Sequence, residues 1–191
     1  MNTTKLTKTI AAYTFSAIVA VSATQAWAAG THGGGHDDKM SVGKAGKAEK
    51  ASRTIEIKMF DNYYEPENIS VKEGETVRFV IKNAGDFVHE FNIGTSEMHA
   101  SHQKEMMMMM EHGALEPDKI NHNMMMMDMG NGKTMKHEDP NSVLLEPGKS
   151  GEVVWTFAKS SDIEFACNVP GHYESGMMGK VRFNGKSGSG S

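Results

Sequence analysis

The chain has 191 residues, with 20 Lys and Arg against 24 Asp and Glu, and a formal net charge of −4 at pH 7. This mildly acidic balance argues against nucleic acid and anionic membrane surfaces as partners. The length suffices for one domain with a hydrophobic core, and a single cysteine excludes an internal disulfide.

The first 28 residues have the pattern of a secretory signal peptide. Lys5 and Lys8 form a positive start, residues 10–23 form a short apolar run, and Ala26-Trp27-Ala28 provides the small residues of a cleavage site. An uncleaved membrane anchor is the alternative, and the shortness of the apolar run disfavours it. We therefore expect export to the periplasm, with no membrane anchor after cleavage. The mature chain would carry 18 basic and 24 acidic residues.

Residues 29–52 lack apolar periodicity and are rich in Gly, Ala, Lys and His, which predicts a flexible linker. From Arg53 onward, apolar and polar residues alternate, as in half-buried strands. The alternating segments are 55–59, 69–71, 77–82, 87–93, 143–145, 153–157, 163–167 and 181–183. We expect an all-β domain over 53–184, an antiparallel β-sandwich or Greek-key barrel, followed by a flexible tail at 185–191.

An insertion of different composition, residues 95–139, interrupts the strands. It holds 12 of the 17 methionines and five of the nine histidines. Residues 97–113 contain good helix formers and no proline, which predicts a helix that ends at Gly113. Pro117 and two later glycines predict a mostly irregular loop over 115–136.

The strongest chemical signal lies near the C-terminus. Cys167 precedes His172 by five residues, and His172 precedes Met177 by five, in a Pro-Gly loop that follows a predicted strand. Thiolate, imidazole and thioether are donors of a type 1 copper site, which also needs a second imidazole. We expect that imidazole from His89, because Phe87, His89, Phe91 and Ile93 share one face of their strand.

Each donor has a simpler interpretation when it is taken alone. A single inward cysteine is usually a small buried hydrophobe, and a histidine on an apolar face is usually a core residue. The conjunction of donors favours a metal site, and a thioether donor favours copper over structural zinc. Met177 is preferred to Met178 as the axial donor because it directly follows Gly176.

This ligand pattern resembles the cupredoxins, the plastocyanin and azurin family, over 53–94 and 141–184. The resemblance implies a cupredoxin-type fold that binds copper, Cu(I) or Cu(II), with His89, Cys167 and His172 as equatorial ligands and Met177 as the axial one. Many members place Asn after the first histidine, where this chain has Glu90. The sequence His-Glu-Phe-Asn-Ile at 89–93 and the Met/His-rich insertion are most similar to exported copper-tolerance cupredoxins of the CopI type.

The methionine runs have two interpretations. Five consecutive methionines on a helix point in every direction, so one apolar face does not explain them. They either form an adaptable packing surface or bind additional Cu(I) through neutral thioethers. The candidate accessory residues are Met98, His99, His102, Met106, Met107, Met108, Met109, Met110, His112, His122, Met124, Met125, Met126, Met127 and Met129.

Two functions therefore fit the sequence. The first is copper tolerance, in which the protein holds one ion in the type 1 site, captures further Cu(I), and thereby either lowers toxic free copper or passes the ion to an exporter or oxidase. The alternative is a soluble periplasmic one-electron carrier with a redox partner protein. An enzymatic function is disfavoured, because the chain has no His-x-His pair and no room for a second copper domain.

Overall fold

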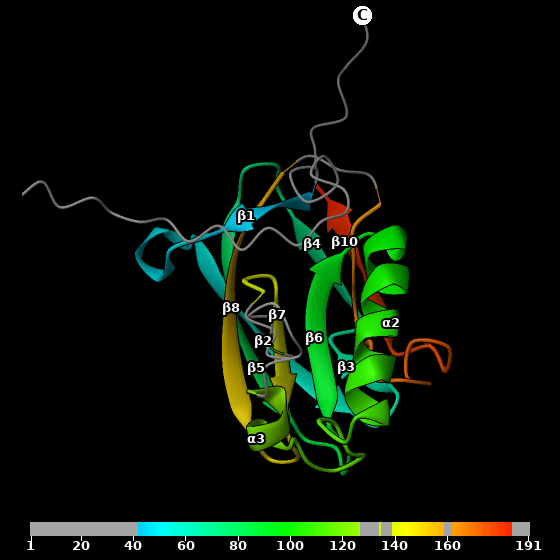
Figure 1. Ribbon diagram of the computed structural model, residues 1–191. Coiled ribbons are helices and arrows are strands. Elements are labelled where there is room, and N and C mark those ends of the chain that lie inside the picture. Colours follow the sequence, from blue (N-terminus) through cyan, green and yellow to red (C-terminus); the bar gives the residue numbers. More distant parts are fainter. Residues whose placement is uncertain (1–41, 127–133, 135–138, 159–161, 185–191) are drawn as a thin grey trace, which may run out of the picture. The chain divides into compact units, whose positions relative to one another are not determined.

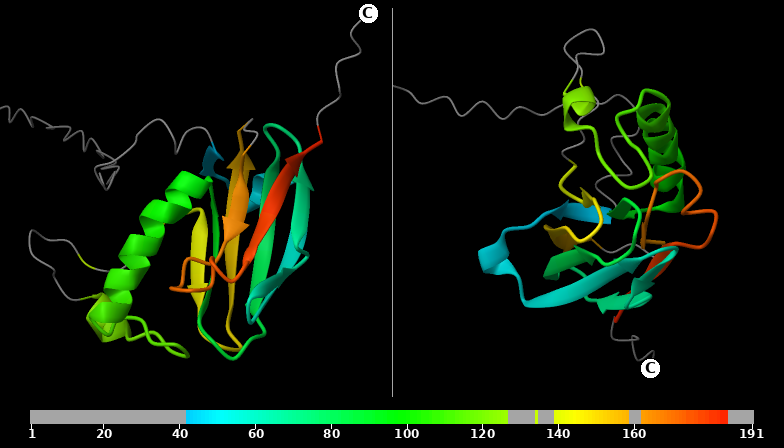
Figure 2. Two further views of the ribbon diagram at one scale, coloured as in Figure 1. Left: turned by 90° about the vertical axis from the view of Figure 1, so that its right-hand side faces the viewer. Right: turned by 90° about the horizontal axis from the view of Figure 1, so that it is seen from below.

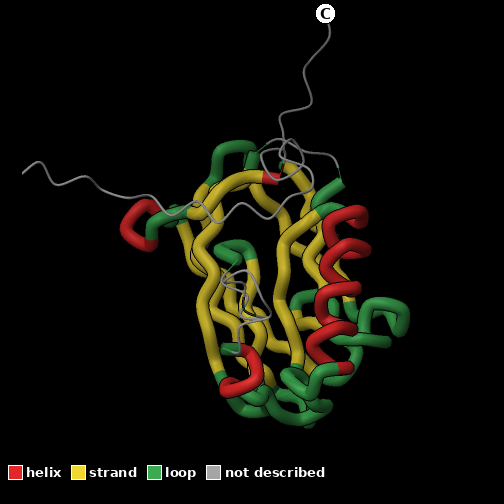
Figure 3. The backbone as a smooth tube through the Cα atoms, in the orientation of Figure 1, coloured by secondary structure: helices red, strands yellow, loops and turns green. Residues whose placement is uncertain are grey.

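The computed structural model describes residues 42–126, 134, 139–158 and 162–184. Two β-sheets face each other, with the helices outside them (Figures 1 and 3). The predicted signal peptide, linker residues 29–41, the tail at 185–191, and Met127 and Met129 lie outside the described residues. No helix in the described part of the chain is long and apolar enough to cross a membrane.

Among the described residues, each sheet has five strands and one parallel pair. The first sheet has the order β1 (Gly43–Ala45), β8 (Ser150–Phe157), β5 (Thr76–Asn83), β2 (Arg53–Phe60) and β3 (Tyr63–Glu65). The second has the order β4 (Asn68–Val71), β10 (Met178–Phe183), β9 (Glu164–Ala166), β6 (His89–Gly94) and β7 (Ser142–Leu145). The β2–β5 and β4–β10 pairs are parallel and the other pairs are antiparallel, so the expected all-β sandwich is confirmed, although not every strand pair in it is antiparallel.

The core lies between the sheets and is dominated by aromatic rings. Phe91 of β6 packs on Phe79 of β5 and on Phe165 of β9, with ring centroids 5.3 and 5.4 Å apart. Tyr64 of β3 meets Phe165 edge to face at 5.1 Å, and its hydroxyl donates to the Glu90 carbonyl. Such pairs add about 0.5–1.5 kcal/mol each beyond the area they bury. This packing fixes β6 and β9 side by side in the second sheet.

Strand β6 is buried along its whole length, on both faces. Helix α2 (Ser96–Glu111) follows it directly and lies alongside it (Figures 1 and 2). The helix begins where the Thr95 side chain accepts a hydrogen bond from the Met98 N–H, and it ends before Gly113, whose φ of 70° is left-handed. The predicted helix is therefore confirmed. The rest of the insertion includes the short helix α3 (His122–Met125).

Two boundaries differ from the expected ones. The linker expected over 29–52 contains β1 and the 3-10 turn η1 (Ala48–Lys50), so the fold begins by Val42. Val42 is buried, and its carbonyl accepts from the Trp155 indole at 3.1 Å, a tertiary contact without local sequence signal. Phe87 lies before β6 and is 44% exposed, so its predicted place beside His89 on the inner face was wrong.

Candidate metal centre

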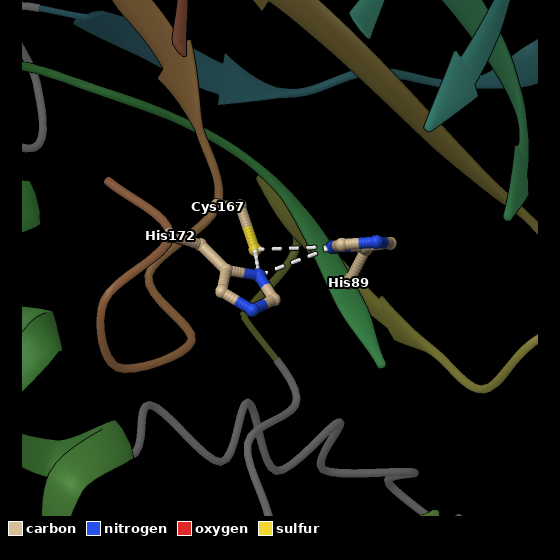
Figure 4. Close-up of side chains that lie close together, drawn as sticks. All are labelled: His89, Cys167 and His172. Atoms are coloured by element: carbon tan, nitrogen blue, oxygen red, sulfur yellow. Dashed lines mark hydrogen bonds between the residues drawn. The ribbon is translucent and has the colours of Figure 1, made fainter. Parts of the chain in front are cut away.

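Three of the four predicted donors converge at one end of the second sheet (Figure 4). His89 is the first residue of β6, Cys167 directly follows β9, and His172 lies in the loop between β9 and β10. Because β6 pairs with β9, residues that are far apart in sequence become neighbours there.

The donor atoms lie at separations that suit a common ion. His89 Nδ1 is 3.9 Å from Cys167 Sγ, His172 Nδ1 is 3.3 Å from Cys167 Sγ, and the two Nδ1 atoms are 3.2 Å apart. Donors that each lie about 2.0–2.3 Å from one metal ion have separations of this size. His89 and Cys167 are fully buried, and His172 is partly exposed.

Met177 is fully buried and closes the loop that carries His172. The Met177 N–H donates to the His172 carbonyl at 3.0 Å, and the Cys167 N–H donates to the Met177 carbonyl at 3.1 Å. Met178 begins β10 and is partly exposed. The burial of Met177 and its backbone bond to Cys167 support it over Met178 as the fourth donor.

Asp61, which the sequence did not reveal, orients the first histidine. Its Oδ1 lies 2.9 Å from His89 Nε2, so that nitrogen carries the proton and Nδ1 presents its lone pair to the centre. Burial lowers the pKa of His89, although Asp61 opposes this, which favours the neutral ring that a metal requires. Gly85 permits the approach, because a Cβ there would lie 2.3 Å from Asp61 Oδ1.

The thiol of Cys167 is held in a dry environment. Burial raises the pKa of Cys167 to about 12, so the metal-free thiol keeps its proton at neutral pH. The Glu90 N–H donates to Sγ at 3.3 Å, which favours the thiolate once an ion displaces that proton. A soft cation that binds here therefore releases a proton.

Glu90 replaces the asparagine of many cupredoxins and still ties the cysteine loop to β6. Its Oε2 accepts from the Asn168 side-chain amide at 2.8 Å and from the Asn168 N–H at 3.3 Å. Its Oε1 lies 2.9 Å from His102 Nε2 on helix α2. A helix of the insertion thus contacts the residue that adjoins the cysteine.

The structure divides the candidate accessory residues of the insertion into a buried group and an accessible group. His99, His102, Met106 and Met109 recur on one face of α2 and are buried against the sandwich, as is Met125 of α3. Burial and hydrogen bonding remove these side chains from the surface where a free ion would first be met. Packing therefore explains part of the methionine run. Other members remain accessible, at least in part: Met98, Met107, Met108, Met110, His112, His122, Met124 and Met126.

Comparisons with known proteins agree with this architecture. A family model described as a cupredoxin-like domain matches residues 17–101. Auracyanin B superposes with a TM-score of 0.53 at 18% identity, covering 75% of this chain and 97% of its own. Dithionite-reduced auracyanin from Roseiflexus castenholzii gives 0.50 at 23% identity, covering 71% and 99%. At such identities the likeness establishes the cupredoxin fold and no more.

Two curated relatives are much more similar in sequence. The copper-resistant cuproprotein CopI of Pseudomonas aeruginosa is 51% identical over 147 residues, which cover 74% of this chain and 81% of the relative. The protein of the same name from Rubrivivax gelatinosus is 41% identical over 154 residues, covering 80% and 78%. At this identity and coverage, the chain belongs to the cupredoxin family, in the group that contains the CopI cuproproteins.

Proposed function

We propose that this protein binds one copper ion through His89, Cys167, His172 and Met177 and serves copper tolerance in the periplasm. The observation that carries the proposal is the convergence of three donor atoms, all within 4.8 Å of one another. Two relatives that are named copper-resistant cuproproteins support it. The function is binding and delivery of an ion, without substrate turnover.

The donor chemistry favours copper over other metals. One thiolate, two imidazoles and a thioether suit Cu(I) and Cu(II), whereas structural zinc takes four strong donors. Bound copper supplies one-electron chemistry and an intense thiolate charge-transfer absorption. The chain supplies a buried thiol, one imidazole held by Asp61, and a second imidazole on a partly exposed loop.

We further propose that the accessible methionines of the insertion capture additional Cu(I). Met107, Met108 and Met126 are 45%, 47% and 59% exposed, although such apolar side chains are usually buried. Thioethers need no deprotonation, so they bind soft cations over a wide pH range. Each exposed methionine also risks oxidation outside the cytosol, so a binding function explains their retention better than surface packing does.

The copper site is tested by titration of the mature protein with Cu(II). We expect one ion per chain and an intense visible band, which Cys167→Ser abolishes. Glu174→Gln, in an exposed part of the same loop, is the matched control and should keep the band. A band of full intensity in Cys167→Ser would refute the proposed ligands.

Cu(I) capture is tested by competition with a Cu(I) chelator. The triple Met→Leu variant at residues 107, 108 and 126 should bind fewer ions per chain than the wild type. The double variant Met106→Leu/Met109→Leu is the control, because it removes buried thioethers with a nearly volume-conserving change. If both variants lost the same number of Cu(I) ions, or neither lost any, the exposed methionines would have a packing function instead.

A soluble electron carrier is the second candidate. The partial exposure of His172 favours it, because this residue offers a short path from the centre to a partner surface. Growth of a deletion strain separates the two functions. Sensitivity to added copper supports copper tolerance, whereas a respiratory defect at ordinary copper supports electron transfer to an oxidase or another redox partner.

A further inference from the structure

Glu90 is a buried acidic side chain beside the proposed copper centre. Only 2% of its surface is exposed, and an uncompensated charge at such depth is strongly unfavourable. Both of its oxygens are occupied. Oε1 accepts from the side chains of His102 and Asn92 at 2.9 and 3.3 Å, and Oε2 accepts from the Asn168 side chain and backbone at 2.8 and 3.3 Å.

His102 supplies the balancing positive charge from helix α2. Its Nε2 faces Glu90 at 2.9 Å, and its Nδ1 faces Glu105 at 3.0 Å. Because carboxylates only accept hydrogen bonds when ionised, both ring nitrogens must carry protons, and the ring is an imidazolium. Its side chain is 10% exposed, so water screens the pair with Glu90 only weakly.

Glu90, which pairs with His102, links the backbone next to His89 with the segment that carries Cys167. The Glu90 N–H donates to Cys167 Sγ, and the Glu90 carboxylate binds Asn168, the next residue after that cysteine. His99, one turn before His102 on the same helix, lies 3.2 Å from the Asn168 side-chain amide. Helix α2 therefore contacts the cysteine loop through two histidines.

We infer that helix α2 positions the copper centre: His102 neutralises Glu90, and Glu90 in turn fixes the Cys167–Asn168 segment against β6. The insertion is thus an integral part of the centre as well as a carrier of methionines. This inference rests on the proposed copper site. Without His102, an ionised Glu90 would place an unbalanced negative charge close to the thiolate, and such a charge stabilises Cu(II) over Cu(I) and lowers the reduction potential.

The test compares His102→Leu with Glu90→Gln/His102→Leu, in which both charges are removed. In the metal-free protein, we expect a thiol reagent to modify Cys167 at least ten-fold faster in His102→Leu than in the wild type. In the copper-loaded protein, we expect a lower potential and a shifted visible band. The double variant should return the potential toward the wild-type value. Lys104→Leu, at an exposed position of the same helix, should change neither readout.

The outcomes separate this inference from the copper proposal. Unchanged thiol reactivity in His102→Leu, or a change no larger than in Lys104→Leu, overturns the positioning function whether or not copper binds. If the wild-type protein binds no copper, the proposed copper site is refuted. The thiol measurement on the metal-free protein still tests whether His102 positions the segment that carries Cys167. Should His102→Leu fail to fold, the double variant decides. A folded double variant with wild-type potential supports charge balance, and one with the potential still lowered overturns it.

Discussion

Asp61→Ala tests how the first histidine is oriented. The carboxylate of Asp61 accepts from His89 Nε2 at 2.9 Å, and nothing in the local sequence marks it as part of the site. Its removal frees the ring to rotate and to exchange the proton between its nitrogens. The Nδ1 lone pair then faces the centre for only part of the time, so copper affinity should fall.

The size of the effect follows from the environment of the bond. A hydrogen bond to a charged group contributes about 1.5–3 kcal/mol. The Asp61 side chain is 35% exposed, so solvent screening places this bond at the lower end, about 1.5 kcal/mol. That energy corresponds to roughly a ten-fold loss in affinity, the lower limit of the 10–100-fold typical for residues that orient metal ligands.

Chelator competition at pH 7 measures this loss. Gly85→Ala provides an independent perturbation, because its Cβ would lie 2.3 Å from Asp61 Oδ1 and displace a carboxylate that is still present. Asp86→Asn is the matched control, since only its backbone N–H contacts Asp61 in the described hydrogen bonds. If both Asp61→Ala and Gly85→Ala kept copper affinity within two-fold of the wild type, the orienting function would be refuted.

Three further predictions concern the helix, the axial donor and the core. Burial alone would lower the pKa of His102, but Glu90 and Glu105 raise it to about 10. The contribution of protonated His102 to the free energy of unfolding is therefore complete below pH 6.5, the ordinary pKa of histidine, and is lost as the pH rises through about 10. Chemical denaturation between pH 6 and 10 should show this loss in the wild type and much less of it in Glu90→Gln. Met177→Leu should shift the visible spectrum of the copper form, and Met178→Leu should leave it unchanged; the reverse result would reassign the axial donor. Phe79→Ala should lower the free energy of unfolding by about 3–5 kcal/mol in urea denaturation, because the ring is fully buried, whereas Phe87→Ala, at 44% exposed, should cost far less.

Local patterns were enough to predict most strands and the helix of the insertion. Period-two alternation identifies β2, β5 and β8 because each has one face toward the core. The same logic misjudged Phe87, since alternation does not tell where a strand begins. It also missed β1, whose short Gly-Lys-Ala segment is a strand only because β8 offers it a free edge.

The methionine run shows a second limit of sequence reasoning. Five identical residues carry no pattern, so the sequence alone does not separate buried members from exposed ones. Packing of α2 on β6 separates them, because Met106 and Met109 lie on the helix face that also carries His99 and His102. Composition groups those histidines with the candidate accessory donors, and only the structure shows that they also belong to the hydrogen-bond network around Glu90.

The sequence by itself singled out the candidate donors, because the chain has one cysteine and the histidine and methionine that follow it lie within one short loop. It also predicted the sandwich, since the alternation of apolar and polar residues shows which face of each strand is buried. Only the tertiary structure decided which distant groups support the donors. Asp61, Glu90 and His102 reach the centre through strand pairing and helix packing, and such long-range contacts leave no periodic trace in a single chain.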